Sequence, residues 1–182
     1  MGAGPAGLAC ADVLRRNGLD VLVVDKNVKG GGLLYYGIPS FKLPKKVVER
    51  RMDIYQKEGI KFEFNRSITT EDEIESLVRG HDAVLWAAGA VQPVMPKIPG
   101  VQGAGFYTSD VFLAKVNRSP ESAKSEFNIS GATVAVLGAG DSAMDCARSA
   151  VRLGAGRVFC IARKPKNSVS SDKNELMLAE SE

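Results

Sequence analysis

Met1-Gly2-Ala3-Gly4-Pro5-Ala6-Gly7 opens the chain and has the G-x-G-x-x-G spacing of a dinucleotide-binding turn. In such a turn Gly2 permits the tight bend, Gly4 lets the backbone approach a pyrophosphate, and Gly7 lets the next helix pack closely on the sheet. The turn normally follows a buried strand, whereas here only Met1 precedes it. We therefore expect a phosphate-binding turn whose first strand is missing from this chain.

A helix and a buried strand are predicted after this turn. The helix runs from Pro5 to Asn17 and stops at Gly18, and the apolar run from Val21 to Val24 is typical of a buried parallel strand. Asp25 ends this strand about 20 residues after the turn, where a carboxylate accepts hydrogen bonds from ribose hydroxyls. An ordinary turn residue is the alternative, but the order of turn, helix and strand favours ribose binding.

Three consecutive glycines, Gly30 to Gly32, form the next unusual feature. Packing does not explain three glycines in a row, so we expect them to expose backbone N–H groups to a pyrophosphate or an isoalloxazine edge. A flexible turn is the alternative. The following elements are a helix from Pro44 to Glu58, a half-buried strand from Lys61 to Asn65, a helix capped by Thr70 and Glu73, and a buried strand from Ala83 to Gly89.

The second half of the chain repeats the same pattern after a connection rich in proline and glycine from Val91 to Gly105. A short helix is predicted after Ser109, and a polar surface loop that contains a little helix from Asn117 to Ser130. The repeat comprises a strand from Ala132 to Leu137, a glycine turn from Gly138 to Ala143, a helix from Ser142 to Leu153 and a strand from Val158 to Ala162.

The two repeats differ in the residues that follow their second strand. Asp25 follows it in the first repeat and Arg163-Lys164 in the second. A carboxylate at this position recognises a free ribose 2′-hydroxyl, whereas cations suit the 2′-phosphate of NADP. The first turn is therefore expected to bind a nucleotide with plain ribose, such as FAD, and the second to bind NADP; a solvated loop is the alternative for Arg163-Lys164.

Composition excludes several classes of function. The net charge of +3 is too small to indicate nucleic-acid binding, and no apolar run approaches the length of a membrane span. Cys10, Cys146 and Cys160 are isolated, which favours small core residues of a cytoplasmic protein over disulfides or metal ligands, so no metal site is expected. His81 is the only histidine, which argues against a catalytic triad, and no catalytic side chain is assigned.

The predicted fold is therefore α/β, with two Rossmann-like dinucleotide-binding units, each with a parallel sheet, and with the chain truncated at both ends. Residues 1–105 are expected to form a partial FAD unit, residues 106–130 a connection, and residues 131–182 a partial, inserted NADP unit.

Longer motifs resemble one flavoprotein family, shared by the glutamate synthase small (beta) subunit and the amino-terminal half of dihydropyrimidine dehydrogenase. The segments most similar to the glutamate synthase subunit are Gly2 to Ala11, Gly31 to Leu34, Tyr36 to Pro39 and Phe41 to Leu43. Those more similar to dihydropyrimidine dehydrogenase are Gly105 to Ser109, Val136 to Asp141, Asp145 to Ala147 and Arg163-Lys164. The resemblance covers essentially the whole chain.

The resemblance implies hydride transfer from NADPH to FAD, and it assigns the cofactor contacts residue by residue. The residues expected to hold FAD are Gly2, Ala3, Gly4, Pro5, Ala6, Gly7, Asp25, Lys26, Gly31, Gly32, Leu33, Lys42 and Ile68. Those expected to hold NADP(H) are Gly138, Ala139, Gly140, Asp141, Ser142, Arg163 and Lys164. Ser170 stands where the dehydrogenase pattern has a further arginine near the 2′-phosphate.

The resemblance also implies that this chain is a fragment of a longer reading frame. The family's cysteine-rich iron–sulfur region lies upstream of the first turn, and its FAD domain resumes after the NADP domain. Sheet edges exposed by the absent strand are expected to favour dimerisation or aggregation.

The expected function is an NADPH-dependent FAD oxidoreductase module that passes electrons through iron–sulfur clusters to a large catalytic subunit or a fused domain. The glutamate synthase type is preferred. Pyrimidine reduction and a truncated nucleotide-binding fragment without activity are the alternatives, and neither nucleic acid nor membrane is an expected partner.

Overall fold

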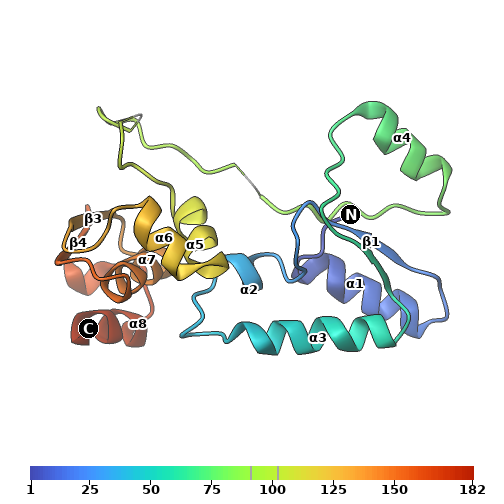
Figure 1. The fold of residues 1–182 in the computed structure, drawn as a ribbon, viewed down its shortest axis with the longest axis horizontal. Coiled ribbons are helices and arrows are strands. Elements are labelled where there is room, and N and C mark those ends of the chain that lie inside the picture. The colour runs from blue at the N-terminus through green and yellow to red at the C-terminus, as the bar shows by residue number, and fades with distance from the viewer. Residues whose placement is uncertain (91, 102) are drawn as a thin grey trace. The chain divides into compact units, whose positions relative to one another are not determined.

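A computed structural model describes residues 1–90, 92–101 and 103–182 of the chain. The elements follow the order α1–β1–α2–α3–β2–α4 in the first half and α5–α6–β3–α7–β4–η1–α8 in the second (Figure 1). Both sheets contain two parallel strands, and helices separate the paired strands in sequence. The predicted α/β class with parallel sheets is thus confirmed. Val91, where the predicted connection begins, lies outside the described residues.

Contacts divide the chain into two compact units. The first contains Met1–Tyr35 and Ser40–Gln92, and the second contains Tyr36–Pro39 and Pro93–Glu182. This division differs from the predicted ranges 1–105, 106–130 and 131–182, because residues 106–130 pack with the second unit instead of forming a separate connection. Which nucleotide each unit binds stays a prediction at this point.

The first unit is built around the β1–β2 pair. Its elements are α1 (Pro5–Arg16), β1 (Leu22–Val24), α3 (Lys45–Lys57), β2 (Lys61–Glu63) and α4 (Glu71–Arg79), and α2 (Leu33–Tyr36) begins in it. Leu22 pairs with Lys61, and Val24 with Glu63. The core joins α1, β1 and α3 through Leu8, Ala11, Val23, Met52 and Tyr55. Burial of these apolar side chains is the main force that holds the unit together.

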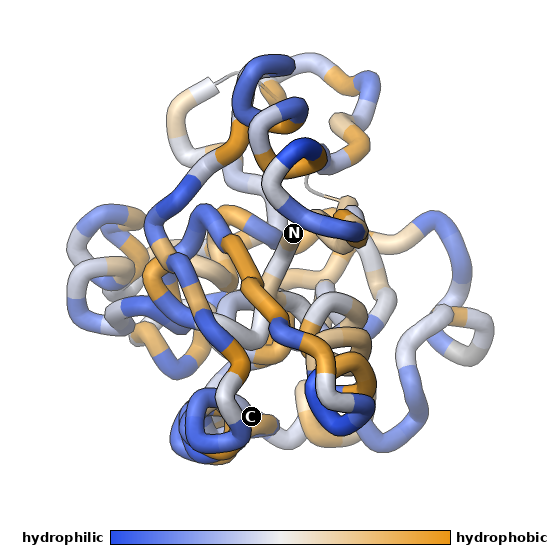
Figure 2. The backbone as a smooth tube through the Cα atoms, turned by 90° about the vertical axis from the view of Figure 1, so that its right-hand side faces the viewer, coloured by the Kyte–Doolittle hydropathy of each residue, from blue (hydrophilic) through white to orange (hydrophobic). Residues whose placement is uncertain are grey.

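Local sequence signals explain where these helices begin and end. Pro5 occupies the first turn of α1, a position that tolerates proline because its N–H would have no helical partner there. The predicted capping box of α4 is confirmed: Thr70 Oγ1 accepts a hydrogen bond from Glu73 N, and Thr70 N donates to Glu73. Hydrophilic and hydrophobic residues alternate along the helical segments in Figure 2, as in helices with one buried face.

The second unit is built around the β3–β4 pair. Its elements are α5 (Ser109–Arg118), α6 (Pro120–Glu126), β3 (Thr133–Leu137), α7 (Asp141–Arg152), β4 (Arg157–Ile161), the 3₁₀ turn η1 (Lys166–Ser168) and α8 (Lys173–Ser181). Thr133 pairs with Arg157, and Leu137 with Ile161. The helix α7 packs against both strands, α5 and α8, so its residues from Ala143 to Ala150 are buried. It is the central helix of this unit.

The prediction of a buried strand from Ala83 to Gly89 was wrong. This segment has no regular structure, and Trp86 is 56% exposed. Its described backbone pairing is with Met1 alone: the Met1 amino group donates to Leu85 O at 2.6 Å, and Ala87 N donates to Met1 O at 2.7 Å. An apolar run forms a strand only when a neighbouring strand supplies a ladder of hydrogen-bond partners. Met1 alone cannot supply such a ladder to residues 83–89.

From Asn117 to Ser130 the prediction of some helix is confirmed, but the prediction that the segment is mainly a polar surface loop was wrong. Most of this segment is helical, and Ala123 and Ile129 pack with Ala150 and Leu153 in the core of the second unit. The hydroxyl of Ser119 accepts from Ser122 N at 3.3 Å and caps α6. A helix of this kind buries only one small residue in its middle, so the sequence carries almost no apolar signal for it.

None of the helices in the described ranges is long and apolar enough to cross a membrane.

Candidate nucleotide-binding sites

The first glycine turn is tightly enclosed by its own unit. Gly2 has φ +98°, a conformation that favours glycine, and its N–H donates to Val24 O at 2.8 Å. A Cβ on Gly2 would lie 2.2 Å from Ala87 O, and one on Gly7 would lie 1.9 Å from Gly2 O. Both positions therefore require glycine. The tight bend and the close helix packing predicted from the spacing are confirmed.

Asp25 holds this turn in place from the end of β1. Its Oδ2 accepts a hydrogen bond from Ala3 N at 2.7 Å, and its Oδ1 accepts from Asn27 N at 2.8 Å. Asn27 Nδ2 also donates to Oδ1, at 3.1 Å. A carboxylate has about four acceptor positions, two on each oxygen, so acceptor capacity remains on Oδ2. The side chain can fix the turn and also accept hydrogen bonds from a ligand hydroxyl.

The glycine run from Gly30 to Gly32 is explained by packing, contrary to our expectation. A Cβ on Gly30 would lie 2.5 Å from Met52 Cε, and one on Gly31 would lie 2.6 Å from Val48 Cγ1. The Gly31 N–H is also occupied, because it donates to Ala3 O at 2.7 Å. This run therefore packs between α3 and the first turn, and the Gly31 N–H does not point outward to a ligand.

Gly32 nevertheless forms one wall beside the turn. A Cβ there would lie 2.8 Å from Gly4 Cα, so the two glycines bring separate backbone segments almost into contact. Leu33 follows at the start of α2, and 68% of its surface is exposed although it is apolar. Asp25, Gly31 and Gly32 are therefore brought together at the turn, as predicted.

The other residues expected at the first site lie further along this surface. Pro5 and Ala6 are exposed at the open N-terminus of α1, which has neither a side-chain cap nor an acidic residue in its first turn. Lys26 is exposed beside Asp25, and Lys42 is exposed between α2 and α3. Ile68 is half-buried in the segment after β2. The role of Lys26, Lys42 and Ile68 as ligands stays a prediction.

Side chains of α3 also contact α2, the short helix that follows the glycine run. Lys45 Nζ donates to Leu34 O at 3.4 Å and lies 5.7 Å from the Tyr35 ring centre, and Tyr35 Oη donates to Glu49 at 3.3 Å. Partial burial lowers the pKa of Lys45 to about 8. These contacts join Leu34 and Tyr35 of α2 to α3, the core helix of the first unit.

The second glycine turn is more open. Gly138 has φ +135° and donates its N–H to Ile161 O at 2.9 Å, so it joins β3 to β4 at their carboxyl ends. A Cβ on Gly138 would meet Ala143 Cβ at 3.7 Å, an ordinary contact distance. Ala143 takes the place that Gly7 has in the first turn, and α7 begins at Asp141. The helix here needs no third glycine.

The segment that contains Ser170 lies over this second turn, and the turn motif gave no reason to expect Ser171 and Asp172 there. Ser171 N donates to Ala139 O at 3.2 Å, and Asp172 N donates to Asp141 Oδ1 at 2.9 Å. Ser170 Oγ is 3.4 Å from the point where Gly140 would carry a Cβ. Asp141 is thus engaged by this segment, whereas Ser142 is exposed. The spacing of Asp172 and Glu175 is typical of a helix N-terminus, and it was the sequence signal that could have indicated α8.

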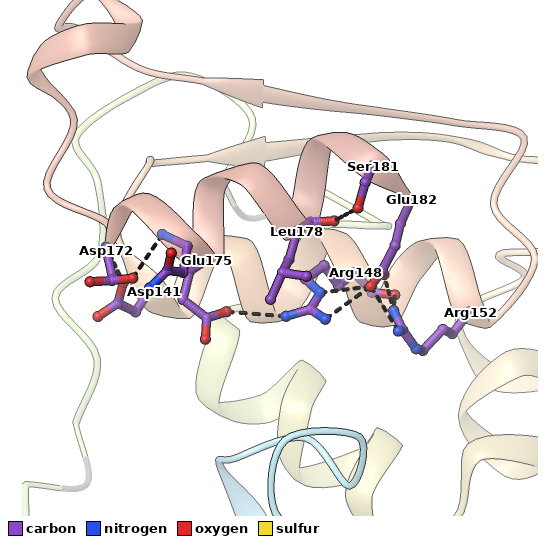
Figure 3. A network of polar contacts seen from close by, with 9 residues as sticks. Asp141, Arg148, Arg152, Asp172, Glu175, Leu178, Ser181 and Glu182 are labelled. Atoms are coloured by element: carbon purple, nitrogen blue, oxygen red, sulfur yellow. Dashed lines mark hydrogen bonds and ion pairs between the residues drawn. The ribbon is translucent and has the colours of Figure 1, made fainter.

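Ion pairs hold α8, and with it this covering segment, on α7 (Figure 3). The guanidinium of Arg148, whose side chain is 8% exposed, binds Glu175 at 3.1 Å and Glu182 at 2.9 Å. Arg152 also pairs with Glu182. Hydrogen bonds from Arg152 and then Arg148 hold the pKa of Glu182 at about 2. Ion pairs therefore attach α8, and the covering segment Ser170–Asp172 that precedes it, to the central helix α7.

Arg163 and Lys164 lie where the sequence placed them, just beyond β4. Together with Gly138, Ala139 and Ser170 they line a hollow of about 1100 Å³ beside the second turn. Pro96, Lys97 and Ile98 line the same hollow, although the motif gave no reason to expect them there. The hollow thus joins a phosphate-type turn to exposed cations.

The three cysteines differ in burial: Cys146 is buried, Cys10 is half-buried and Cys160 is exposed. All three are free thiols. Burial raises the pKa of Cys146 to about 12 and also raises the pKa of Cys160. A protonated thiol is a poor nucleophile. The prediction of a core residue is confirmed for Cys146 and is wrong for Cys160, which is exposed.

Comparisons with known proteins agree with this geometry. The chain is 41% identical over 187 residues to the putative oxidoreductase AegA of Escherichia coli (strain K12), with 100% of this chain and 28% of AegA covered. It is 38% identical over 187 residues to the glutamate synthase (NADPH) small chain of the same organism, with 100% of this chain and 40% of that protein covered. The chain therefore spans less than half the length of these relatives.

Solved structures show the same fold. FprA from Mycobacterium tuberculosis in complex with NADPH superposes with a TM-score of 0.80 at 22% identity, over 98% of this chain and 46% of FprA. The resemblance inferred from the motifs is confirmed by the sequence matches. The model of the pyridine nucleotide-disulphide oxidoreductase family matches residues 1–177, and the chain belongs to that family.

Proposed function

We propose that this chain is the two-nucleotide part of an NADPH-dependent flavin oxidoreductase, with FAD at the first turn and NADP(H) at the second. The observation that carries the proposal is the contrast in charge beyond the two parallel strands. Asp25 follows β1 and contacts the first turn, while Arg163 and Lys164 follow β4 and line the hollow at the second. The carboxylate suits a ribose diol, and the cations suit a 2′-phosphate.

The residues present fit these two groups. At the first turn Gly2, Gly4 and Gly7 allow close backbone approach, and the open N-terminus of α1 favours a pyrophosphate. At the second turn Gly138 and Gly140 likewise allow close approach of the backbone to a phosphate group. NADPH supplies a hydride and FAD accepts it when both are bound; the protein's part is to orient them and exclude water.

The relatives support the electron route that we propose. The glutamate synthase (NADPH) small chain is 38% identical to this chain, which favours delivery of electrons through iron–sulfur clusters to a large catalytic subunit or a fused domain. Pyrimidine reduction is the competing destination. The three free thiols favour a reducing compartment, so we propose that the protein is cytoplasmic.

A titration of the purified protein with NADPH tests the proposal. We expect a flavin absorption band that NADPH bleaches under anaerobic conditions, with Asp25→Asn losing the flavin and Arg163→Gln retaining it. A colourless protein that takes up no added FAD would overturn the proposal. Mixing with a glutamate synthase large subunit tests the destination, and electron flow to a pyrimidine-reducing FMN domain instead would favour the competing one.

A further inference from the structure

The hollow beside the second turn contains a third cation that the turn motif does not include. Arg163 and Lys164 follow β4, while Lys97 reaches the same hollow from a segment more than 60 residues earlier in the chain. All the charged residues that line the hollow are cations. Its electrostatic character therefore favours an anion.

These three cations are not neutralised by the protein. Within the described ranges, Lys97, Arg163 and Lys164 form no ion pair. Nearby Lys166 differs, since it pairs with Glu180 and lines a separate hollow. Like charges that share one hollow repel each other, and a bound anion removes that repulsion.

We propose that Lys97 is a specificity-determining residue that binds the 2′-phosphate of NADP(H) together with Arg163 and Lys164. The inference rests on the proposed function of the second turn, and it adds a third cation to the group that binds the 2′-phosphate. A phosphate monoester carries a charge of about −1.5 to −2 near neutral pH, so a third cation adds to its affinity. Ser170 lines the same hollow and supplies a hydroxyl but no charge.

Binding of two nucleotide fragments to the full chain tests this role. The probes are 2′,5′-ADP, which carries the 2′-phosphate, and 5′-AMP, which lacks it. We expect Lys97→Gln to weaken 2′,5′-ADP binding about tenfold, the loss typical of one charge-assisted hydrogen bond, and to change 5′-AMP binding less than about twofold. Lys97→Arg is expected to retain most of the affinity. Lys97 is exposed, so these variants should fold.

Matched variants separate this inference from the proposed function. Lys166→Gln removes a cation outside the hollow and is expected to leave both affinities unchanged. If Arg163→Gln weakens 2′,5′-ADP binding while Lys97→Gln does not, the role of Lys97 is overturned and the NADP site stands. If the unmodified protein binds 2′,5′-ADP no better than 5′-AMP, both the NADP assignment and the role of Lys97 are overturned.

Discussion

The two glycine turns of this chain have the same spacing but differ in how tightly the protein surrounds them. At the first turn Gly2 and Gly7 leave no room for a methyl group, and Gly32 approaches Gly4 closely. At the second turn Gly138 has ordinary free space and Ala143 takes the third position. The first turn is therefore a part of its unit's core, whereas the second is an open turn that a separate segment covers.

This difference indicates where each site obtains its specificity. The carboxylate of Asp25 accepts a hydrogen bond from the backbone of the first turn, and it can also accept one from a ligand. Within the described residues, Arg163 and Lys164 form no ion pair, and both are exposed side chains that line the hollow. Substitution of Asp25 should consequently change folding and binding together, whereas substitution of Arg163 or Lys164 should change binding alone.

The largest expected effect comes from adding one methyl group to the first turn. Gly7→Ala places a Cβ against Gly2 O and should lower the free energy of unfolding by about 3–5 kcal/mol, because the backbone cannot move aside without shifting α1. Trp86 is the only tryptophan and lies next to Ala87, which contacts this turn, so its fluorescence during urea unfolding measures the loss.

The matched change at the second turn is Ala143→Gly. It should cost only about 1–2 kcal/mol, from helix propensity and one buried methyl group. Equal losses for the two variants would show that the turns are surrounded equally tightly and would contradict the comparison.

The next largest effect concerns the cover over the second turn. Arg148→Met leaves Glu175 without its buried partner and should cost about 2–3 kcal/mol, seen as faster amide exchange in α8. Arg79→Met in the first unit removes an ion pair with Glu75 in which both side chains are exposed, and should change stability by less than about 0.5 kcal/mol. Unchanged exchange in α8 would mean that apolar contacts alone hold the cover.

Asp25→Asn is expected to have a smaller effect on folding and a clear one on flavin. The amide keeps the shape but weakens the hydrogen bond from Ala3 N, so stability should fall by about 1–2 kcal/mol and FAD affinity with it. Arg163→Gln should change stability by less than about 0.5 kcal/mol. Thermal melting with and without FAD distinguishes the two, and a flavin loss in Arg163→Gln would reverse the proposed assignment of the sites.

The smallest expected effects are on pH dependence, and they have their origin in different units. Glu182 has a pKa of about 2 in the folded protein, so the stability that it contributes is complete above its ordinary value of 4.5 and is lost as the pH falls from 4.5 to 2. Amides of α8 should then exchange faster while those of α1 do not. Simultaneous loss of protection in both helices at pH 3 would contradict this.

Lys45 should make the stability of the first unit depend on pH in an alkaline range. Its folded pKa of about 8 lies below the ordinary 10.5, so the unfolded chain binds more protons between these values. The stability of the first unit should therefore rise slightly from pH 8 to 10.5, and Lys45→Met should abolish the rise. A rise that persists in Lys45→Met would show that another group is responsible.

Much of the fold could be predicted because its signals are local. The helix bounds of α1, α3 and α7, both parallel strand pairs and the capping box of α4 follow from turn residues, caps and apolar periodicity. The strand expected from Ala83 to Gly89 failed because an apolar run specifies burial but not a partner. The loop expected from Asn117 to Ser130 failed because α6 buries little more than Ala123.

Part of the candidate site was equally readable from sequence. The glycines, Asp25 and the Arg163-Lys164 pair occupy positions fixed by counting along a strand–turn–helix–strand unit, and the structure places them beside their turns. The packing role of Gly30 and Gly31 was missed, since it depends on Val48 and Met52, which are distant in sequence.

The sequence alone was sufficient to establish an α/β chain with two phosphate-type turns of opposite neighbouring charge, because both properties belong to short contiguous segments. Only the tertiary structure could show that one turn is enclosed and the other open, that residues 36–39 pack with the second unit, and that Lys97 reaches the hollow of Arg163. These features depend on contacts between distant segments, and the identity of such partners is not encoded in any local pattern.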